Sequence, residues 1–177
     1  MAKHKLEEIC EIQKGKVPIS KAVEGEYPLV TTAEQRGTHS EYHFDKESVI
    51  IPMVSSTGHG HASIKRLHIQ DGKFAVGNIL AVLTPKDDAQ VLAKYLYAYL
   101  SFHKEGKLVS LMKGSANVSL TLAKLKGVEV EIPTLSLQER VIEFVDYISA
   151  LESEINLLQD DASKLFNIGL KELFENE

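Results

Sequence analysis

The spacing of apolar residues divides the chain near residue 134. In residues 135–177 they recur at alternating steps of four and three, the heptad spacing of a coiled coil rather than the 3.6-residue period of a lone surface helix. The residues of this seam are Leu137, Val141, Phe144, Ile148, Leu151, Ile155, Leu158, Ala162, Leu165 and Gly169. Ser136 and Glu139 have the spacing of a capping box, which predicts that the helix starts at Ser136. We therefore expect one long helix that needs a partner helix along its seam.

Residues 1–134 instead begin with the short apolar runs that are typical of strands. Such runs lie at 27–32, 49–53 and 79–84, and the last is continuous enough for a buried strand. The dipeptide Asp71–Gly72 lies between two further runs and has the composition of a hairpin turn. Residues 1–85 are therefore predicted to be β-rich.

Helical patterns enter the sequence after this β-rich part. Pro85–Asp88 supplies N-cap candidates for a helix that the spacing predicts to end near Gly106. The apolar face of that helix consists of Leu92, Tyr95, Leu96, Tyr99 and Leu100. A short helix over 120–126 and a strand over 128–133 follow.

These patterns predict an α+β fold in two parts. A β-rich globular domain is expected over 1–134, and a long C-terminal coiled-coil helix over 135–177. Neither internal repeats nor low-complexity segments are present in the sequence. A chain of 177 residues is long enough for one such core plus an appended element.

Composition indicates a cytoplasmic protein with no membrane partner. No apolar run approaches the ~20 residues of a membrane span, and the first residues lack the apolar core of a signal peptide. Cys10 is the single cysteine, which excludes an internal disulfide and agrees with a reducing compartment.

The net charge of −5 is unevenly distributed. Residues 1–128 hold 17 Lys and Arg against 13 Asp and Glu, whereas residues 129–177 hold 3 against 12. The first part can therefore face phosphates, and the second is repelled by them. Acidic helices are also ordinary solvated surfaces, so this asymmetry alone does not establish nucleic-acid binding.

The segment Ser55–His61 is the first candidate for DNA contact. It follows a predicted strand and is rich in hydroxyl groups, which can bind phosphates together with backbone amides, and Lys65 and Arg66 add positive charge nearby. A flexible surface loop explains the same composition equally well.

Three histidines in this region raise the question of a metal site. His59 and His61 alternate along the chain, with His68 nearby. A zinc site needs three or four ligands, which alternate residues on a loop supply less naturally than a helical His-x-x-x-His pair. No metal site is predicted.

The segment Lys113–Asn117 is the second candidate loop. A lysine can bind a phosphate or a guanine edge, and an asparagine amide can bind adenine through two hydrogen bonds. The segment is also compatible with a plain turn in which Ser119 caps the next helix, and both interpretations can hold together. Arg36, one of three arginines in the chain, is a further candidate base reader, although an exposed loop arginine is more often a solvated charge.

Motifs of the relevant enzyme classes are absent from the sequence. There is no phosphate-binding Gly-x-x-x-x-Gly-Lys-Ser/Thr motif, no dinucleotide-binding glycine motif after a strand, and no Asn/Asp-Pro-Pro-Tyr/Phe motif of adenine methyltransferases. Asp88 with Glu105 and Lys107 imitates a nuclease pattern, but these residues flank a predicted helix rather than adjacent strands. Methylation or cleavage would have to come from a partner chain.

The order of elements around the second candidate loop resembles a known family. The loop Gly114–Ser119, a short helix, a strand ending in Ile-Pro and the segment Leu135–Ile142 opening a long helix resemble the target-recognition domain and conserved spacer helix of a type I restriction-modification specificity subunit. The segments Tyr27–Thr32, Ser48–Gly58 and Phe74–Leu83 fit the same resemblance. Members of that family usually carry two recognition domains and two spacer helices, so the chain is similar to a half-length subunit.

The resemblance implies a non-catalytic subunit that gives DNA sequence specificity to a methyltransferase subunit and, in the complete complex, to an endonuclease/translocase subunit. S-adenosylmethionine, magnesium and ATP would belong to those partners, with no cofactor in this chain. Double-stranded DNA is expected to contact Thr31, Thr32, Arg36, Ser55, Ser56, Thr57, His59, Lys65, Arg66, Lys113, Ser115 and Asn117. A second copy of the chain is expected to pair antiparallel through Phe144, Ile148, Leu151, Ile155, Leu158, Ala162 and Leu165.

Two other functions remain open at this point. One is a coiled-coil interaction protein whose N-terminal domain binds another protein and never DNA, and the other is a stand-alone nuclease. Salt-dependent DNA binding separates the first from a specificity subunit, and metal-dependent cleavage by the purified chain would indicate the second. The target bases, the spacer length and the end of the helix do not follow from the sequence.

Overall fold

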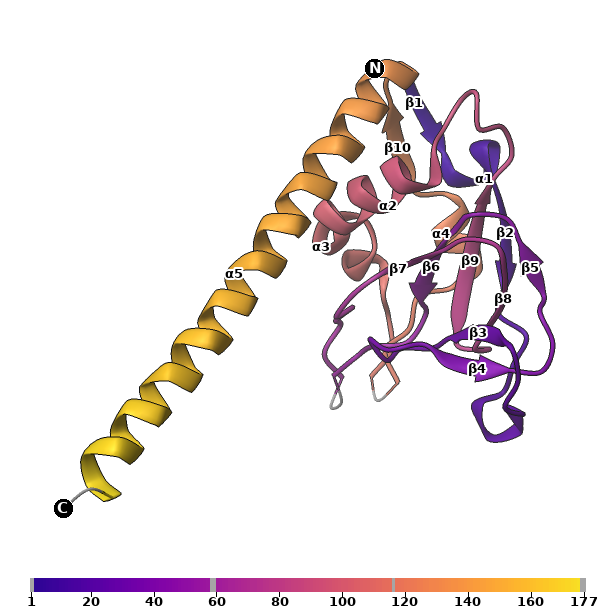
Figure 1. Ribbon diagram of the computed structural model, residues 1–177. Coiled ribbons are helices and arrows are strands. Elements are labelled where there is room, and N and C mark those ends of the chain that lie inside the picture. Colours follow the sequence, from indigo (N-terminus) through magenta and orange to yellow (C-terminus); the bar gives the residue numbers. More distant parts are fainter. Residues whose placement is uncertain (1, 58–59, 116, 176–177) are drawn as a thin grey trace. The chain divides into compact units, whose positions relative to one another are not determined.

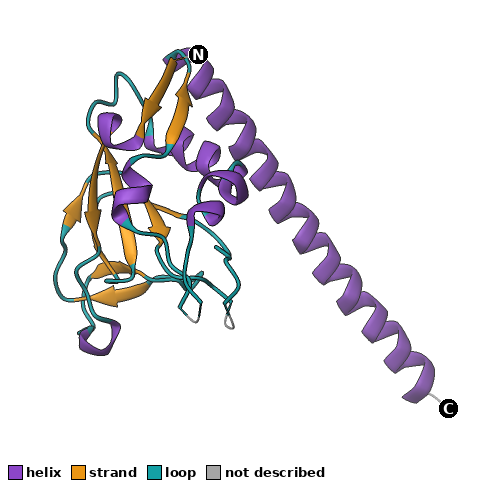
Figure 2. Cartoon of the chain, turned by 180° about the vertical axis from the view of Figure 1, so that it is seen from behind, coloured by secondary structure: helices purple, strands orange, loops and turns teal. Residues whose placement is uncertain are grey.

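A computed structural model describes residues 2–57, 60–115 and 117–175 (Figure 1). Its strands are β1 (Ala2–Lys5), β2 (Cys10–Lys14), β3 (Tyr27–Val30), β4 (Gly37–His39), β5 (Phe44–Asp45), β6 (Ser48–Pro52), β7 (His68–Gln70), β8 (Lys73–Val76), β9 (Leu80–Pro85) and β10 (Glu129–Ile132). Its helices are α1 (Leu6–Ile9), α2 (Ala93–Phe102), α3 (Lys104–Lys107), α4 (Leu122–Lys126) and α5 (Leu135–Glu175), with 3₁₀ turns η1 (Ile19–Lys21) and η2 (Val109–Leu111). The predicted α+β class and the long C-terminal helix are confirmed (Figure 2).

Two four-stranded sheets enclose the core of the globular part. One is antiparallel with the order β2-β9-β6-β7, and the other has the order β4-β3-β8-β5 with β3 and β8 parallel. Buried apolar side chains from both sheets form one cluster of Val30, Phe44, Ile50, Phe74, Val76, Leu80 and Val82. A separate two-stranded sheet pairs β1 with β10 and so joins the two ends of this part of the chain.

Strand β6 is covered on both faces, which explains its continuous apolar sequence. All five of its residues are buried. Because side chains alternate across a strand, Ile50 enters the cluster between the sheets while Val49 and Ile51 point to the other face. Helix α2 packs against β6 and β7. The uninterrupted apolar run is therefore typical of a fully buried strand rather than of a half-exposed one.

The predicted hairpin at Asp71–Gly72 is wrong, although the turn itself exists. Gly72 has φ = +70°, and its N–H donates to Asp71 Oδ1 at 2.7 Å. The strands on either side do not pair with each other, because β7 pairs with β6 while β8 pairs with β3 and β5. Phe74 and Val76 of β8 pack in the core between the sheets, and the chain therefore crosses from one sheet to the other at this turn.

The predicted helix starts also need correction. Helix α5 begins at Leu135, where the Thr134 carbonyl accepts from the N–H groups of Leu137 and Gln138, so Ser136 lies inside the first turn and forms no capping box. The N-cap of α4 is Thr121, whose hydroxyl accepts from Lys124 N–H at 3.3 Å, rather than Ser119. In both helices the residue immediately before the first turn is a threonine.

Helix α2 receives its N-terminal cap from a distant side chain. It begins only at Ala93, because Asp87 forms a separate turn in which its carboxylate accepts from Ala89 N–H at 2.9 Å. The fully buried Gln138 accepts from Leu92 N–H at 2.9 Å. Its amide nitrogen donates to the carbonyls of Gln90 at 2.9 Å and Pro133 at 3.0 Å. One side chain thus satisfies three backbone groups at the start of two helices.

The chain forms two compact units, Met1–Glu139 and Arg140–Glu177. The first turn of α5 belongs to the globular unit, and the rest of this 41-residue helix forms the other. At 1.5 Å per residue α5 is about 60 Å long. None of the described helices combines the length and apolarity needed to cross a membrane.

Candidate nucleic-acid interface

The second predicted loop is the tip of a small hairpin. Lys113 and Ser119 exchange two backbone hydrogen bonds of 2.9 and 3.0 Å, and Met112 just before the hairpin and Val118 within it are buried. Gly114 has φ = +144°, and a Cβ at this position would lie 2.2 Å from the Asn117 carbonyl oxygen. Only glycine fits this conformation. The hairpin presents Ser115 and Asn117 to solvent.

The two predicted loops lie side by side in space. Gly60 has φ = +77°, and a Cβ built on it would lie 2.6 Å from the Ser115 carbonyl oxygen. A backbone bond from Ser55 N–H to the Val118 carbonyl, at 2.9 Å, joins the bases of the loops. The segments that the sequence analysis singled out separately thus form one surface.

Serine hydroxyls hold the first loop in shape. Ser55 Oγ donates to the His61 carbonyl at 2.6 Å and accepts from Ser63 N–H at 3.1 Å, while Ser56 Oγ donates to Ser63 Oγ at 3.0 Å. Thr57 Oγ1 lies 3.3 Å from the same His61 carbonyl. These hydroxyl groups form hydrogen bonds mainly within the loop, so their main role is to fix its conformation.

A basic hollow of about 290 Å³ gathers five of the predicted DNA-binding residues from three segments of the chain. Its lining consists of Thr32, Pro52, Val54, Ser55, Ser56, Lys65, Arg66 and Ile79. Buried Ile64 and Leu67 anchor the segment that carries Lys65 and Arg66. Lys65 is exposed, whereas Arg66 forms an ion pair of 2.7 Å with the exposed carboxylate of Glu34. Because that ion pair lies at the surface, it contributes little stability and leaves Arg66 able to exchange partners.

A polar hollow of about 300 Å³ adjoins the basic one. Its lining consists of Val54, Ser55, Ser56, Thr57, Asn117, Val118 and Ser119. Val54, Ser55 and Ser56 line both hollows. A cationic region and a region of hydroxyl and amide groups therefore share one wall, which suits contacts to phosphates and to base edges respectively.

Arg36 is held within the protein. Its guanidinium donates to Gln70 Oε1 at 3.0 Å and to the Ile69 carbonyl at 3.1 Å, and it lies 3.1 Å from His68 Nδ1. These bonds tie the loop after β3 to strand β7. Burial and the positive charges of Arg36 and Arg66 lower the pKa of His68 from its ordinary 6.5 to about 4.

The remaining predicted residues are more scattered. Thr31 Oγ1 accepts from Ala33 N–H at 3.2 Å, and Lys113 is exposed on the hairpin. His59 lies outside the described residues. Where the structure describes the chain, no three His, Cys, Asp or Glu side chains gather as metal ligands.

The residues of the nuclease-like pattern form ion pairs and hydrogen bonds with other residues and do not interact with one another in these contacts. Asp88 pairs with Lys46 at 3.1 Å, Glu105 pairs with Lys104 at 3.6 Å, and Lys107 donates to the Glu129 carbonyl at 2.7 Å.

Burial raises the pKa of the Cys10 thiol to about 12, so it remains a protonated core residue.

Several residues that shape this surface were not among those predicted from the sequence. Gly60 and Gly114 set the loop conformations, and their position between two histidines and between a lysine and a serine, respectively, was a usable signal. Val54 and Ile79 line the hollows, but an apolar residue beside a strand gives no sequence signal that distinguishes it from core.

Residues 1–159 match the family described as type I restriction modification DNA specificity domain. The chain belongs to this family. It is 32% identical over 97 residues to a putative type I restriction enzyme specificity subunit of Haemophilus influenzae, an alignment that covers 54% of this chain and 24% of that protein.

Solved specificity subunits have the same fold. The type I restriction-modification S subunit from M. genitalium superposes with a TM-score of 0.70 at 17% identity, over 99% of this chain and 46% of that one. The HsdS subunit from Thermoanaerobacter tengcongensis gives 0.62 at 20% identity, over 89% and 39%. A chain of a type I system described for complex assembly and conformational transition gives 0.67 at 20% identity, over 94% and 43%. The chain thus spans less than half the length of these relatives.

In this member of the specificity-domain family, the helical seam predicted from the sequence is exposed along α5. The exposed fractions are 64% for Phe144, 37% for Ile148, 36% for Leu151, 52% for Ile155, 63% for Leu158 and 70% for Leu165, and Ala162 is also exposed. At 100° per residue, Tyr147, Phe166 and Leu173 fall on the same side of the helix and were missed, because they break the four-three spacing. Leu157 and Ile168 lie on another side.

Proposed function

We propose that this chain is a non-catalytic DNA sequence-recognition subunit of a type I restriction-modification system. The observation that supports this most is the gathering of Thr32, Ser55, Ser56, Lys65 and Arg66 from separate segments around one basic hollow, in a chain of the specificity-domain family. The adjoining hairpin carries Lys113 and Asn117, so a duplex lying across both loops meets positive charge and amide groups together.

The proposed partners supply the chemistry. A methyltransferase subunit would bind S-adenosylmethionine and modify the DNA, and an endonuclease/translocase subunit would use magnesium and ATP. The complex would act in the cytoplasm, where a bacterial chromosome lies. The enzyme motifs missing from the sequence are then expected in those subunits.

The proposed assembly is an antiparallel homodimer through α5. Burying a large aliphatic side chain contributes roughly 1.5–3 kcal/mol, and a two-fold interface buries each seam residue twice. Two copies of this chain would also carry the two recognition domains and two spacer helices that the resemblance implies for a full-length subunit, and this chain spans less than half of its solved relatives.

DNA binding by the purified chain, alone and with its methyltransferase subunit, tests this function. Affinity for duplex DNA should fall as salt rises, because binding releases counterions from phosphates. Lys65→Ala and Lys113→Ala should each weaken binding, whereas Lys171→Ala on the acidic α5 serves as the matched control. Equal losses from all three variants would show that the interface is misplaced. No DNA binding even with the methyltransferase present would favour a protein-interaction module instead.

A further inference from the structure

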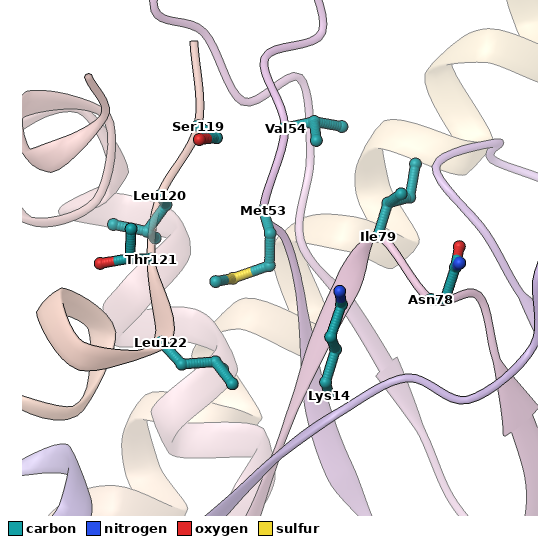
Figure 3. A pocket seen from close by; sticks show the side chains of 9 residues that line it. All are labelled: Lys14, Met53, Val54, Asn78, Ile79, Ser119, Leu120, Thr121 and Leu122. Carbon is teal, nitrogen blue, oxygen red and sulfur yellow. The ribbon is translucent and has the colours of Figure 1, made fainter. Parts of the chain in front are cut away.

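A third hollow, of about 340 Å³, adjoins the basic and polar hollows and is mainly apolar (Figure 3). Its walls include Met53, Val54, Ile79 and Leu122. Val54 lines all three hollows, and Ile79 is shared with the basic one. This apolar hollow is therefore continuous with the surface proposed to face DNA.

The walls of the apolar hollow are fixed by backbone hydrogen bonds between distant segments. Met53 N–H donates to the Ile79 carbonyl at 2.9 Å, and Leu120 N–H donates to the Met53 carbonyl at 2.8 Å. Val54 also forms a β-bridge with Ser119. Met53 is buried while Ile79 is 36% exposed, so the floor of the hollow is covered and its rim is accessible. A preformed apolar cavity of this kind binds without a large ordering cost.

One positive charge lies at the rim. Lys14 of β2 lines the hollow together with Asn78 and Ile79 (Figure 3). The Lys14 side chain is exposed and forms no hydrogen bond or ion pair within the described part of the chain. The hollow therefore suits a ligand that carries an apolar group close to an anionic one.

We propose that the apolar hollow takes the C5-methyl edge of a thymine in the recognised half-site, with Lys14 pairing with an adjacent phosphate. This inference rests on the proposed function. In the major groove, the thymine methyl is the large apolar group among the base edges. Cytosine has a hydrogen at C5 where thymine has the methyl group, so it buries less apolar surface in the hollow, which therefore favours thymine.

Replacing thymine by uracil tests this directly, because the change removes only the methyl group. The recognised sequence is first selected from random duplexes with the full chain and its methyltransferase subunit. Each thymine is then replaced by uracil in turn. At one thymine position in each half-site, replacement by uracil should lower the affinity roughly fourfold, which is the effect of removing one buried methyl group.

Variants of the hollow should remove this discrimination. With Ile79→Ala or Val54→Thr, thymine and uracil should bind equally at that position, whereas the exposed control Val23→Thr should leave the fourfold preference intact. Lys14→Ala should weaken binding of the thymine duplex and of the uracil duplex by the same factor. It should also lower the salt dependence of binding by about one counterion. Thermal unfolding of each variant confirms that it is folded.

Three results would overturn the inference. If binding is sequence-specific but no thymine-to-uracil change matters, the hollow does not read thymine and the proposed function stands. If Ile79→Ala weakens methyltransferase capture while DNA discrimination persists, a protein partner occupies the hollow. If no sequence-specific binding exists, the proposed function fails as well.

Discussion

Gln138 illustrates how single side chains position the parts of this protein. It is fully buried and satisfies Leu92 N–H and the carbonyls of Gln90 and Pro133. Gln138→Ala would leave these three part-buried groups without their protein partner, and an unsatisfied group costs about 1–3 kcal/mol when it is fully buried. We expect the free energy of unfolding, measured with urea, to fall by roughly 2–3 kcal/mol.

The exposed Gln90 provides a matched control, since Gln90→Ala makes the same chemical change and keeps the backbone carbonyl that Gln138 uses. Its effect should stay within about 0.5 kcal/mol. Equal losses from both variants would show that the three bonds of Gln138 do not stabilise the fold.

His68 should make stability depend on pH. Its pKa is about 4 in the folded protein, because burial and the neighbouring Arg36 and Arg66 disfavour the charged form. The unfolded chain then binds a proton that the folded chain does not, so this contribution to stability is complete above pH 6.5 and is lost as pH falls towards 4. His68→Asn should lose less stability than the wild type between pH 7 and pH 5, while the exposed His61→Asn should behave like the wild type. An NMR titration of His68 with a pKa near 6.5 would contradict this.

Arg36 shows the limit of prediction at this scale. Its residue type and its place in a polar stretch suggested a base reader, but its guanidinium is held by Gln70, His68 and the Ile69 carbonyl. These partners lie more than 30 residues away in the sequence, so no local pattern could reveal them. Its hydrogen bonds position the loop that carries Thr32, and base reading by Arg36 stays a prediction.

At the scale of elements, the hairpin 113–119 depends on Gly114. With φ = +144° and the Asn117 carbonyl 2.2 Å from any Cβ, Gly114→Ala forces the tip to rearrange at a cost of roughly 1–3 kcal/mol. It should therefore lower both the melting temperature and the affinity for DNA. Gly106→Ala is the control, because nothing lies within 4 Å of its Cβ and alanine favours helix α3 by about 1 kcal/mol. Unchanged DNA affinity in folded Gly114→Ala protein would remove this hairpin from the interface.

Helix α5 offers two adjacent leucines for testing its pairing. Leu157 and Leu158 are 64% and 63% exposed, but only Leu158 lies on the seam. Leu158→Glu places a charge in the proposed dimer interface and should give a monomer by light scattering at micromolar concentration, whereas Leu157→Glu should remain a dimer. A monomeric wild type, or a dimer that survives Leu158→Glu, would contradict pairing through the seam.

Some helices and strands could be predicted from the sequence, and others could not. The seam of α5 and the buried strands β6 and β9 were predictable, because their periodicity is local. The separation of β7 and β8 into different sheets was not, because strand pairing follows from packing in the core between the sheets. The hollows were likewise unpredictable, since their walls come from segments that only the fold brings together, although most of their polar residues had been singled out.

At the scale of the whole molecule, the charge distribution and the symmetry of the proposed homodimer would decide which DNA sequences the protein can read. Residues 1–128 carry a balance of +4 and residues 129–177 one of −9, so DNA should lie on the globular unit and avoid the helix. A homodimer offers the same reading surface twice about a two-fold axis. It should therefore recognise identical half-sites, inverted about a spacer whose length the paired helices set.

Shortening α5 tests the role of the helices as a spacer. Removal of one heptad between Leu151 and Leu165 keeps the seam in register and shortens each helix by about 10 Å. The preferred spacer should change while the half-site bases stay the same. A variant that selects new half-site bases would show that α5 takes part in reading the sequence.

Methylation-site sequencing of DNA modified by the reconstituted complex tests the central claim most directly. This chain is combined with its methyltransferase subunit as the only specificity component, and the modified positions are read by single-molecule sequencing. The homodimer reading DNA through its two globular units predicts a methylated interrupted palindrome with identical inverted half-sites. An asymmetric methylated motif would contradict the symmetric dimer, and methylation without any motif would contradict sequence recognition by this chain.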